Sequence, residues 1–139
     1  MPAALNNSRI RRVTSAAAPE PPPGTWSNCL VVDGIAYVAG LVGRGEDGRA
    51  VKGDEYDQAK AIFVKMRGLI EAAGGTMSDV VKVVIFVTEI KNRERVWRAR
   101  QEVFGGDFPV STLVEVAALA SPDLKVEIEA IAHIGAGAR

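Results

Sequence analysis

The chain has 139 residues, and its 17 Lys and Arg residues balance its 17 Asp and Glu residues. This length suits one domain with a modest hydrophobic core, and an apolar fraction of 47% is ordinary for a globular protein. A balanced charge gives no long-range field that would favour nucleic acid or an anionic membrane. No apolar run reaches the roughly 18 residues that a membrane-spanning helix needs, so we expect neither partner.

The single cysteine and the single histidine restrict the chemistry further. Cys29 precedes an apolar triplet, which indicates a small buried hydrophobe rather than a nucleophile. One cysteine allows no intrachain disulfide, which fits a reducing compartment, and no signal-peptide core is visible, so we expect a cytoplasmic protein. One His and one Cys argue against a zinc site, and we expect no metal and no cofactor.

The N-terminal half predicts strands separated by turns. Residues 1–8 are small and polar and predict a loose tail, and residues 9–14 predict a first strand. Prolines at 19, 21, 22 and 23 make residues 16–24 an extended connector. Residues 29–32 and 35–41 predict a hairpin across Asp33-Gly34, and residues 43–53 predict a loop.

Two helices and a strand follow. Apolar residues recur at three- and four-residue steps over residues 56–73, which predicts a helix capped by Asp54 and ended by Gly74. Residues 76–79 predict a single helical turn, and residues 80–87 predict a buried strand that is apolar on both faces except at Lys82. Asn92 is the predicted cap of a second helix that runs through residue 104.

Residues 109–116 and 125–132 alternate apolar and polar side chains, which predicts two paired strands, each with one buried face. Glu127 and Glu129 fall on the face opposite Val126 and Ile128. A carboxylate on a strand at the rim of a core is a candidate for proton transfer. The alternative is a solvated strand face, which spacing alone favours.

These elements predict an α+β fold in which a single mixed sheet carries two helices on one face. Two helices cannot cover both faces of a sheet, so the second face must be buried by something outside the chain.

Residues 43–48 match the G-x-G-x-x-G pattern of dinucleotide sites. That pattern requires a helix to begin at its last glycine, so that the amide groups face the pyrophosphate. Residues 49–53 predict loop or extended chain instead, which argues against a nucleotide site.

The two C-terminal segments also resemble the signature of the RidA/YjgF family of enamine and imine deaminases. That signature runs Pro-x-Arg-Ser-x-Val-Glu-Val, then a short loop, then Val-Lys-Ile-Glu-Ile-Glu-Ala-Ile-Ala. Residues 23–28, 37–40, 69–75 and 80–87 resemble further family segments in the expected order. The resemblance implies a chorismate-mutase-like RidA domain over residues 9–134, with residues 135–139 as a tail. It also implies a homotrimer with clefts between subunits and a small-molecule substrate.

The resemblance assigns site residues one position at a time. Glu127 matches the residue that activates water, and Ala39-Gly40 matches a Ser-Gly pair. Trp26 retains an aromatic residue of the N-terminal loop, and the backbone at Ser111-Thr112 would orient water and substrate. Ala39 replaces the serine of the Ser-Gly pair, while Gly40 is kept. Three further positions depart from the pattern: Ser111 replaces the arginine that clamps the substrate carboxylate, Leu113 replaces a cysteine, and Trp97 replaces an asparagine.

Ser111 is the most consequential departure, because a hydroxyl supplies neither the charge nor the paired geometry of a guanidinium. In one interpretation the chain is a RidA-like hydrolase with altered substrate preference, in which Trp26 and Trp97 stack on the substrate and Arg98 or Arg100 substitutes as the anion clamp. In the other, catalysis is lost and the trimer binds a metabolite or a protein. Trp97 could also be a core or subunit-contact residue, and Arg93, Arg95, Arg98 and Arg100 a solvated helix face.

Overall fold

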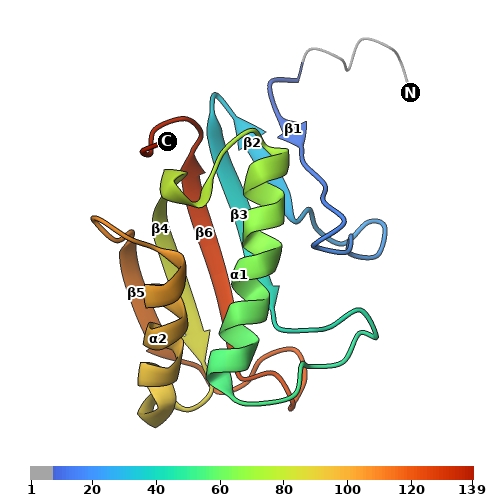
Figure 1. Cartoon of the computed structure of the whole chain (residues 1–139). Coiled ribbons are helices and arrows are strands. Elements are labelled where there is room, and N and C mark those ends of the chain that lie inside the picture. The colour runs from blue at the N-terminus through green and yellow to red at the C-terminus, as the bar shows by residue number, and fades with distance from the viewer. Residues whose placement is uncertain (1–7) are drawn as a thin grey trace.

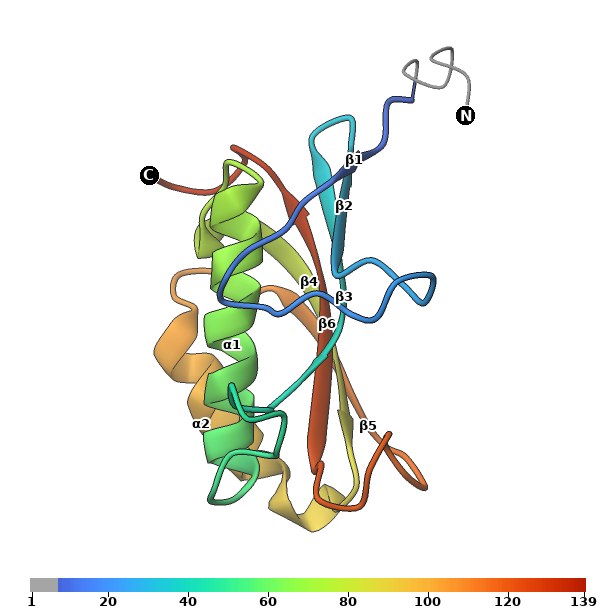
Figure 2. The same ribbon diagram turned by 90° about the vertical axis from the view of Figure 1, so that its right-hand side faces the viewer.

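The computed structural model describes residues 8–139, which form one six-stranded sheet covered on one face by two helices (Figures 1 and 2). The strands are β1 (Arg11–Arg12), β2 (Cys29–Val32), β3 (Ile35–Val42), β4 (Val80–Val87), β5 (Val110–Glu115) and β6 (Val126–His133). The helices are α1 (Glu55–Ala72) and α2 (Arg93–Val103), with 3₁₀ turns η2 (Met77–Asp79) and η3 (Ile90–Asn92). The predicted α+β class with both helices on one face is confirmed.

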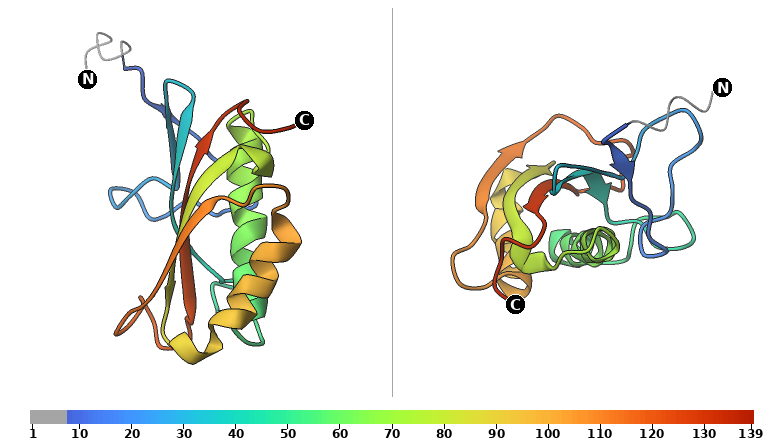
Figure 3. Two further views of the ribbon diagram at one scale, coloured as in Figure 1. Left: turned by 90° about the vertical axis from the view of Figure 1, so that its left-hand side faces the viewer. Right: turned by 90° about the horizontal axis from the view of Figure 1, so that it is seen from above.

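The sheet is mixed, in the order β1-β2-β3-β6-β4-β5. Only β4 and β5 run parallel, and α2 provides the crossover that a parallel pair requires. The helices lie side by side against the same face, and seen from above the sheet curves around them (Figure 3).

The hairpin of β2 and β3 forms as predicted, with Val32 paired to Ile35. Asp33 and Gly34 have φ angles of 50° and 78°. Positive φ at both central residues fits the two-residue turns that match strand twist, which Asp-Gly favours.

Helix α1 begins one residue before its predicted start. Asp54 accepts hydrogen bonds from the backbone N–H groups of Tyr56 and Asp57, and Asp57 accepts one from the N–H of Asp54 in return. Gly74, with a φ of 95°, follows its end. The caps read from the sequence are therefore the caps in the structure.

The core lies between the sheet and the two helices. Its largest fully buried side chains include Ile62, Met66, Leu69, Ile70, Ile85 and Ile128. Cys29 is fully buried in this core, as its apolar neighbours predicted. Residues 43–53 form a loop with no helix at Gly48, so the structural context of a dinucleotide site is missing.

One prediction about the sheet is wrong. Strands β5 and β6 do not pair with each other, because β4 lies between them. β5 is an edge strand that buries little: Leu113 is half-buried, whereas Ser111, Thr112 and Val114 are exposed. The alternation of apolar and polar residues predicted that each segment is a strand, but it did not predict which strand lies next to it in the sheet.

Two smaller predictions also need correction. Asn92 makes no side-chain cap for α2, because its amide donates to the Glu55 carboxylate at 2.8 Å. Strand β4 is not buried on both faces: Val83 and Ile85 are buried toward the helices, but Val84 is only half-buried on the other face.

The face of the sheet away from the helices is therefore open in a single chain, and it exposes apolar side chains of three strands. The predicted N-terminal tail, residues 1–8, lies outside the described residues except for Ser8. Within residues 8–139, neither helix combines the length and the apolar character needed to cross a bilayer.

Candidate functional site

A cavity of ≈ 610 Å³ lies beside the end of β3, where this strand extends beyond its partner β2. The last ladder pair of these strands is Cys29 with Val38, after which one further bond joins the Ala39 N–H to the Asn28 carbonyl. The register with β6 shifts between Val38 and Leu41, which marks a β-bulge. The other edge of β3 is uncovered because β2 does not extend past Cys29, and the cavity is lined there by Trp26, Ala39, Gly40, Arg44, Lys65 and Glu127, among others.

Glu127 is the acidic group of this cavity most suited to proton transfer. It is half-buried on β6, and like Glu129 it points away from the helices, because Val126 and Ile128 fill the helix side. Burial raises the pKa of the Glu127 carboxyl, and the charge of Glu129 raises it further. A carboxyl with a raised pKa is a better proton shuttle near neutral pH.

Gly40 allows Glu127 to lie against the backbone of β3. A Cβ atom added at Gly40 would collide with the Oε2 and Cδ atoms of Glu127. The absence of a side chain at Gly40 therefore sets the position of the carboxylate.

We expect Gly40→Ala to lower activity at least tenfold while the protein stays folded, because the new methyl group displaces the Glu127 carboxylate. Turnover and circular dichroism of the variant check this. Gly105→Ala is a matched control, since its Cβ would meet no atom within 4 Å. Equal losses in both variants would contradict the role given to Gly40.

Trp26 forms an aromatic wall at the rim of the cavity and is 56% exposed. Its Nε1 donates to Oδ1 of Asn28 at 3.3 Å, and the buried Asn28 amide donates to the Pro19 carbonyl at 3.0 Å. The proline-rich connector thus holds the tryptophan beside the cavity.

Three of the remaining predicted site residues, Trp97, Ser111 and Leu113, lie on the helix side of the sheet and form a second cluster. Ser111 pairs with Val83 of β4, whose side chain is buried toward the helices, so Ser111 and Leu113 face α2 while Thr112 faces the open side. Trp97 of α2 is half-buried, with the Arg93 guanidinium 5.6 Å from its ring centroid. One chain therefore does not bring Glu127 and Ser111 together.

The two arginines considered as a substitute clamp differ in placement. Arg100 Nη1 donates to the Ser111 hydroxyl at 2.8 Å. The Arg98 guanidinium stacks on the Tyr56 ring, 3.8 Å from its centroid, which turns it toward α1. Of the two, only Arg100 contacts Ser111, the residue that the resemblance aligns with the family arginine.

Sequence reasoning missed the two cationic residues of the cavity. Arg44 was read as part of a weak nucleotide motif, and Lys65 was not singled out. A signal existed for Lys65, since it falls three residues after Ile62 and four before Leu69, at the edge of the buried stripe of α1.

Comparison with known proteins gives consistent results. The sequence model of the family described as Endoribonuclease L-PSP matches residues 16–134. A RutC family protein of Pyrococcus abyssi is 33% identical over 113 residues, 81% of this chain and 88% of that protein. A 2-iminobutanoate/2-iminopropanoate deaminase of Dermatophagoides farinae is 33% identical over 125 residues, 89% of this chain and 97% of that protein.

Solved structures agree. A protein of unknown function from Pseudomonas aeruginosa is 38% identical, with a TM-score of 0.83 over 92% of this chain and 94% of that one. RidA from a Psychrobacter species is 28% identical, with a TM-score of 0.82 over 89% of this chain and 99% of that one. With most of its length matched in sequence and fold, the chain belongs to the RidA/YjgF family, also described as Endoribonuclease L-PSP.

Proposed function

We propose that residues 9–134 form a cofactor-free hydrolase that deaminates an enamine, an imine or a related small nitrogen compound. The observation that carries this proposal is Glu127, a half-buried carboxyl with a raised pKa at the edge of a cavity of ≈ 610 Å³. Sequence similarity over most of the chain to a protein named 2-iminobutanoate/2-iminopropanoate deaminase supports the reaction class.

The proposed chemistry needs one proton shuttle. Glu127 takes a proton from water as the oxygen attacks the imine carbon and gives it to the imine nitrogen, which forms a carbinolamine. It then takes the remaining proton from the new hydroxyl and gives it to the amino group, so that the carbonyl forms as the carbon–nitrogen bond breaks and ammonia leaves. An enamine first gains a proton on carbon, which the same carboxyl can donate. The backbone at Ala39 and Gly40 lies beside Glu127 and can orient the water and the substrate.

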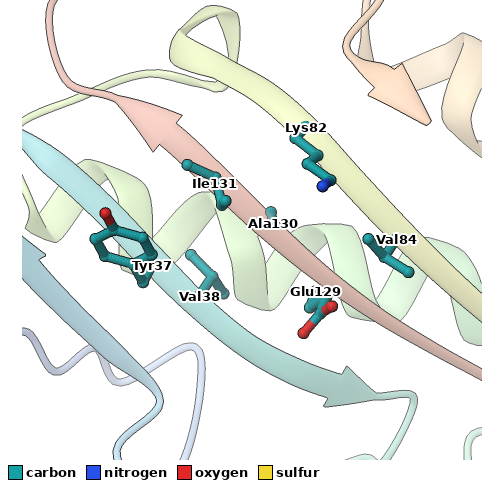
Figure 4. Close-up of a pocket in the computed structure, with 7 residues that line it drawn as sticks. All are labelled: Tyr37, Val38, Lys82, Val84, Glu129, Ala130 and Ile131. Atoms are coloured by element: carbon teal, nitrogen blue, oxygen red, sulfur yellow. The ribbon is translucent and has the colours of Figure 1, made fainter. Parts of the chain in front are cut away.

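We further propose that the protein is a homotrimer in which the two clusters meet across a subunit boundary. The Glu127 cavity of one subunit would then face the Trp97, Ser111 and Leu113 cluster of its neighbour, as the family resemblance implies. The open face of the sheet supports assembly. Tyr37, Ile131 and Val84 lie on it beside Lys82 and Glu129, around a hollow of ≈ 190 Å³ (Figure 4).

The homotrimer predicts a solution mass about three times the 14.8 kDa of the chain, because the apolar open face favours burial over exposure to water. Light scattering coupled to size-exclusion chromatography measures this mass. Val110 and Val114 are exposed on the open face of β5, and replacing both by Glu should lower the mass. A wild-type protein that remains monomeric or dimeric would contradict the proposal.

The function itself is tested by generating imines in the assay and following ammonia release, with a panel of carboxylated, uncharged and aromatic substrates. Because Ser111 replaces the family arginine, we propose that the preference differs from that of arginine-containing relatives. The second candidate, a binding module, rests on the same replacement. It predicts saturable quenching of tryptophan fluorescence by cavity ligands with no ammonia released.

The remaining expectations are proposals as well. The single cysteine, buried in the core, supports a reducing compartment such as the cytoplasm. The zero net charge supports a small molecule, rather than a nucleic acid, as the ligand.

A further inference from the structure

We infer that Lys65 and Arg44 form an anion-binding site inside the Glu127 cavity, and that the substrate carries a carboxylate or similar anion held there. Only the identification of the bound anion as a substrate rests on the proposed function. Anion binding itself can be measured without turnover. Both cations and the cavity belong to a single chain.

Lys65 reaches the cavity from α1. Its Nζ donates to the Val42 carbonyl at 2.9 Å, at the edge of β3 that β2 leaves uncovered. That single bond leaves its other N–H groups for a ligand. The stem of the lysine crosses buried surface between Ile62 and Leu69, so the charge is held in place rather than free in solvent.

Arg44 reaches the same cavity from the loop that follows β3. Its Nη1 donates to the Gly48 carbonyl at 3.0 Å and its Nη2 to the Ser121 hydroxyl at 3.2 Å. Ser121 in turn donates to Asp123, so the guanidinium is anchored between two loops. A fixed guanidinium with unused donors is well suited to bind a carboxylate.

Within residues 8–139, neither cation forms a direct salt bridge, and the acidic group nearest to Arg44 in its hydrogen-bond network is Asp123, joined to it through the Ser121 hydroxyl. In the part of the chain that the structure describes, six ion pairs form, and neither Lys65 nor Arg44 takes part in one. Glu46 and Glu127 also line the cavity, but Glu46 is exposed. Burial lowers the pKa of the Lys65 ammonium, and the charge of Arg44 lowers it further. A bound anion would offset the charge repulsion between them.

The position of Lys65 also fits the reaction. Val42, whose carbonyl holds Lys65, is the ladder partner of Glu127, and neighbouring strands lie about 4.8 Å apart. Lys65 and Glu127 line the same cavity, so a small imine whose carboxylate binds Lys65 would lie in the cavity that holds the carboxyl proposed as the proton shuttle. Hydrolysis adds water to the C=N carbon and expels ammonia, which leaves the corresponding 2-oxo acid.

This site would replace the clamp that Ser111 cannot supply, and it would do so from the Glu127 side of the cleft. Within one chain, Arg98 stacks on the Tyr56 ring and Arg100 lies beside Ser111 outside the cavity, which leaves Lys65 and Arg44 as the cations of the cavity itself. In the proposed trimer, Arg100 would approach this cavity only from a neighbouring subunit. The structure thus favours a cation pair that the comparison of motifs did not suggest.

Binding of 2-oxobutanoate, followed by calorimetry and by Trp26 fluorescence, tests the inference on the full chain. We expect Lys65→Gln and Arg44→Gln each to raise Kd at least tenfold, because each removes a charge-assisted contact. Matched controls are Arg67→Gln on the same helix and Arg49→Gln in the same loop, both exposed, which should stay within twofold. The uncharged 2-oxobutanamide should bind wild type at least tenfold more weakly than the acid.

Three results would overturn the inference: no binding of 2-oxobutanoate at about 10 mM, roughly tenfold above a weak Kd of 1 mM; wild-type affinity in both cavity variants; or a larger loss in Arg100→Gln than in Lys65→Gln. Lys65→Met, which keeps the stem, guards against a folding defect in Lys65→Gln. If the acid binds through Lys65 and Arg44 but no imine is turned over, the anion site stands and the proposed hydrolase fails.

Discussion

Replacing Glu127 by Gln is expected to lower turnover of the imine substrate by about 10²-fold or more, because loss of a general acid–base group costs 10²–10⁴. Glutamine keeps the shape of the side chain and cannot exchange a proton with water. The raised pKa of the Glu127 carboxyl and its place in the cavity make it the group whose loss should matter most. Ammonia release from an imine generated in the assay measures the effect.

Glu129→Gln is the matched control for this substitution. Glu129 lies two residues further along β6 on the same face, and it lines the open-face hollow rather than the Glu127 cavity. We expect Glu129→Gln to reduce turnover much less than Glu127→Gln. The pH dependence of turnover should still change slightly, because the charge of Glu129 contributes to the raised pKa of Glu127. Unchanged turnover in Glu127→Gln would reject the acid–base role.

The parts of the fold that the sequence predicted are those set by local signals. The Asp33-Gly34 pair favours a two-residue hairpin turn, and Asp54 with Asp57 makes a capping box. The predicted bounds of the hairpin and of α1 therefore agree with the structure to within about one residue. The pairing of β5 is not determined by adjacent sequence. Its neighbour in the sheet, β4, is separated from it in sequence by helix α2, whereas β6 follows β5 after a short turn and was therefore predicted as its partner.

The site divides in the same way. Glu127, Gly40 and Trp26 converge on one cavity, which motif resemblance alone had grouped. Ser111 and Trp97 lie elsewhere, because a pattern along one chain does not record whether residues meet within a subunit or between subunits. Lys65 lies in the cavity because its Nζ donates to the Val42 carbonyl. Helical periodicity could suggest that this lysine borders the buried face of α1, but not which strand it contacts.

The C-terminal end of the chain is held by another contact that the sequence did not reveal. Asp79, which is 1% exposed, accepts hydrogen bonds from the backbone N–H groups of Thr76, Gly135 and Gly137 at 2.7 to 3.0 Å. The Arg139 guanidinium donates to both of its oxygens, at 2.9 and 3.1 Å. One buried carboxylate thereby ties the end of β6 and the residues after it to η2.

Replacing Asp79 by Ala should lower the free energy of unfolding at pH 7 by about 3 kcal/mol, because several buried donors lose their acceptor at once. The bond from Arg139 holds the pKa of the Asp79 carboxyl well below its usual range, with the backbone bonds adding to it. A depressed pKa stabilises the folded state above the unfolded pKa of about 3.9, and this contribution is lost as the pH falls below that value. Urea unfolding at equal protein concentration should therefore show the full difference in free energy of unfolding between wild type and Asp79→Ala at pH 7, and a smaller difference below pH ~4.

Asp107→Ala, at an exposed aspartate, is the control and should change the free energy of unfolding by less than about 0.5 kcal/mol. An equal loss in both variants, or an advantage that does not narrow in acid, would contradict the role of Asp79.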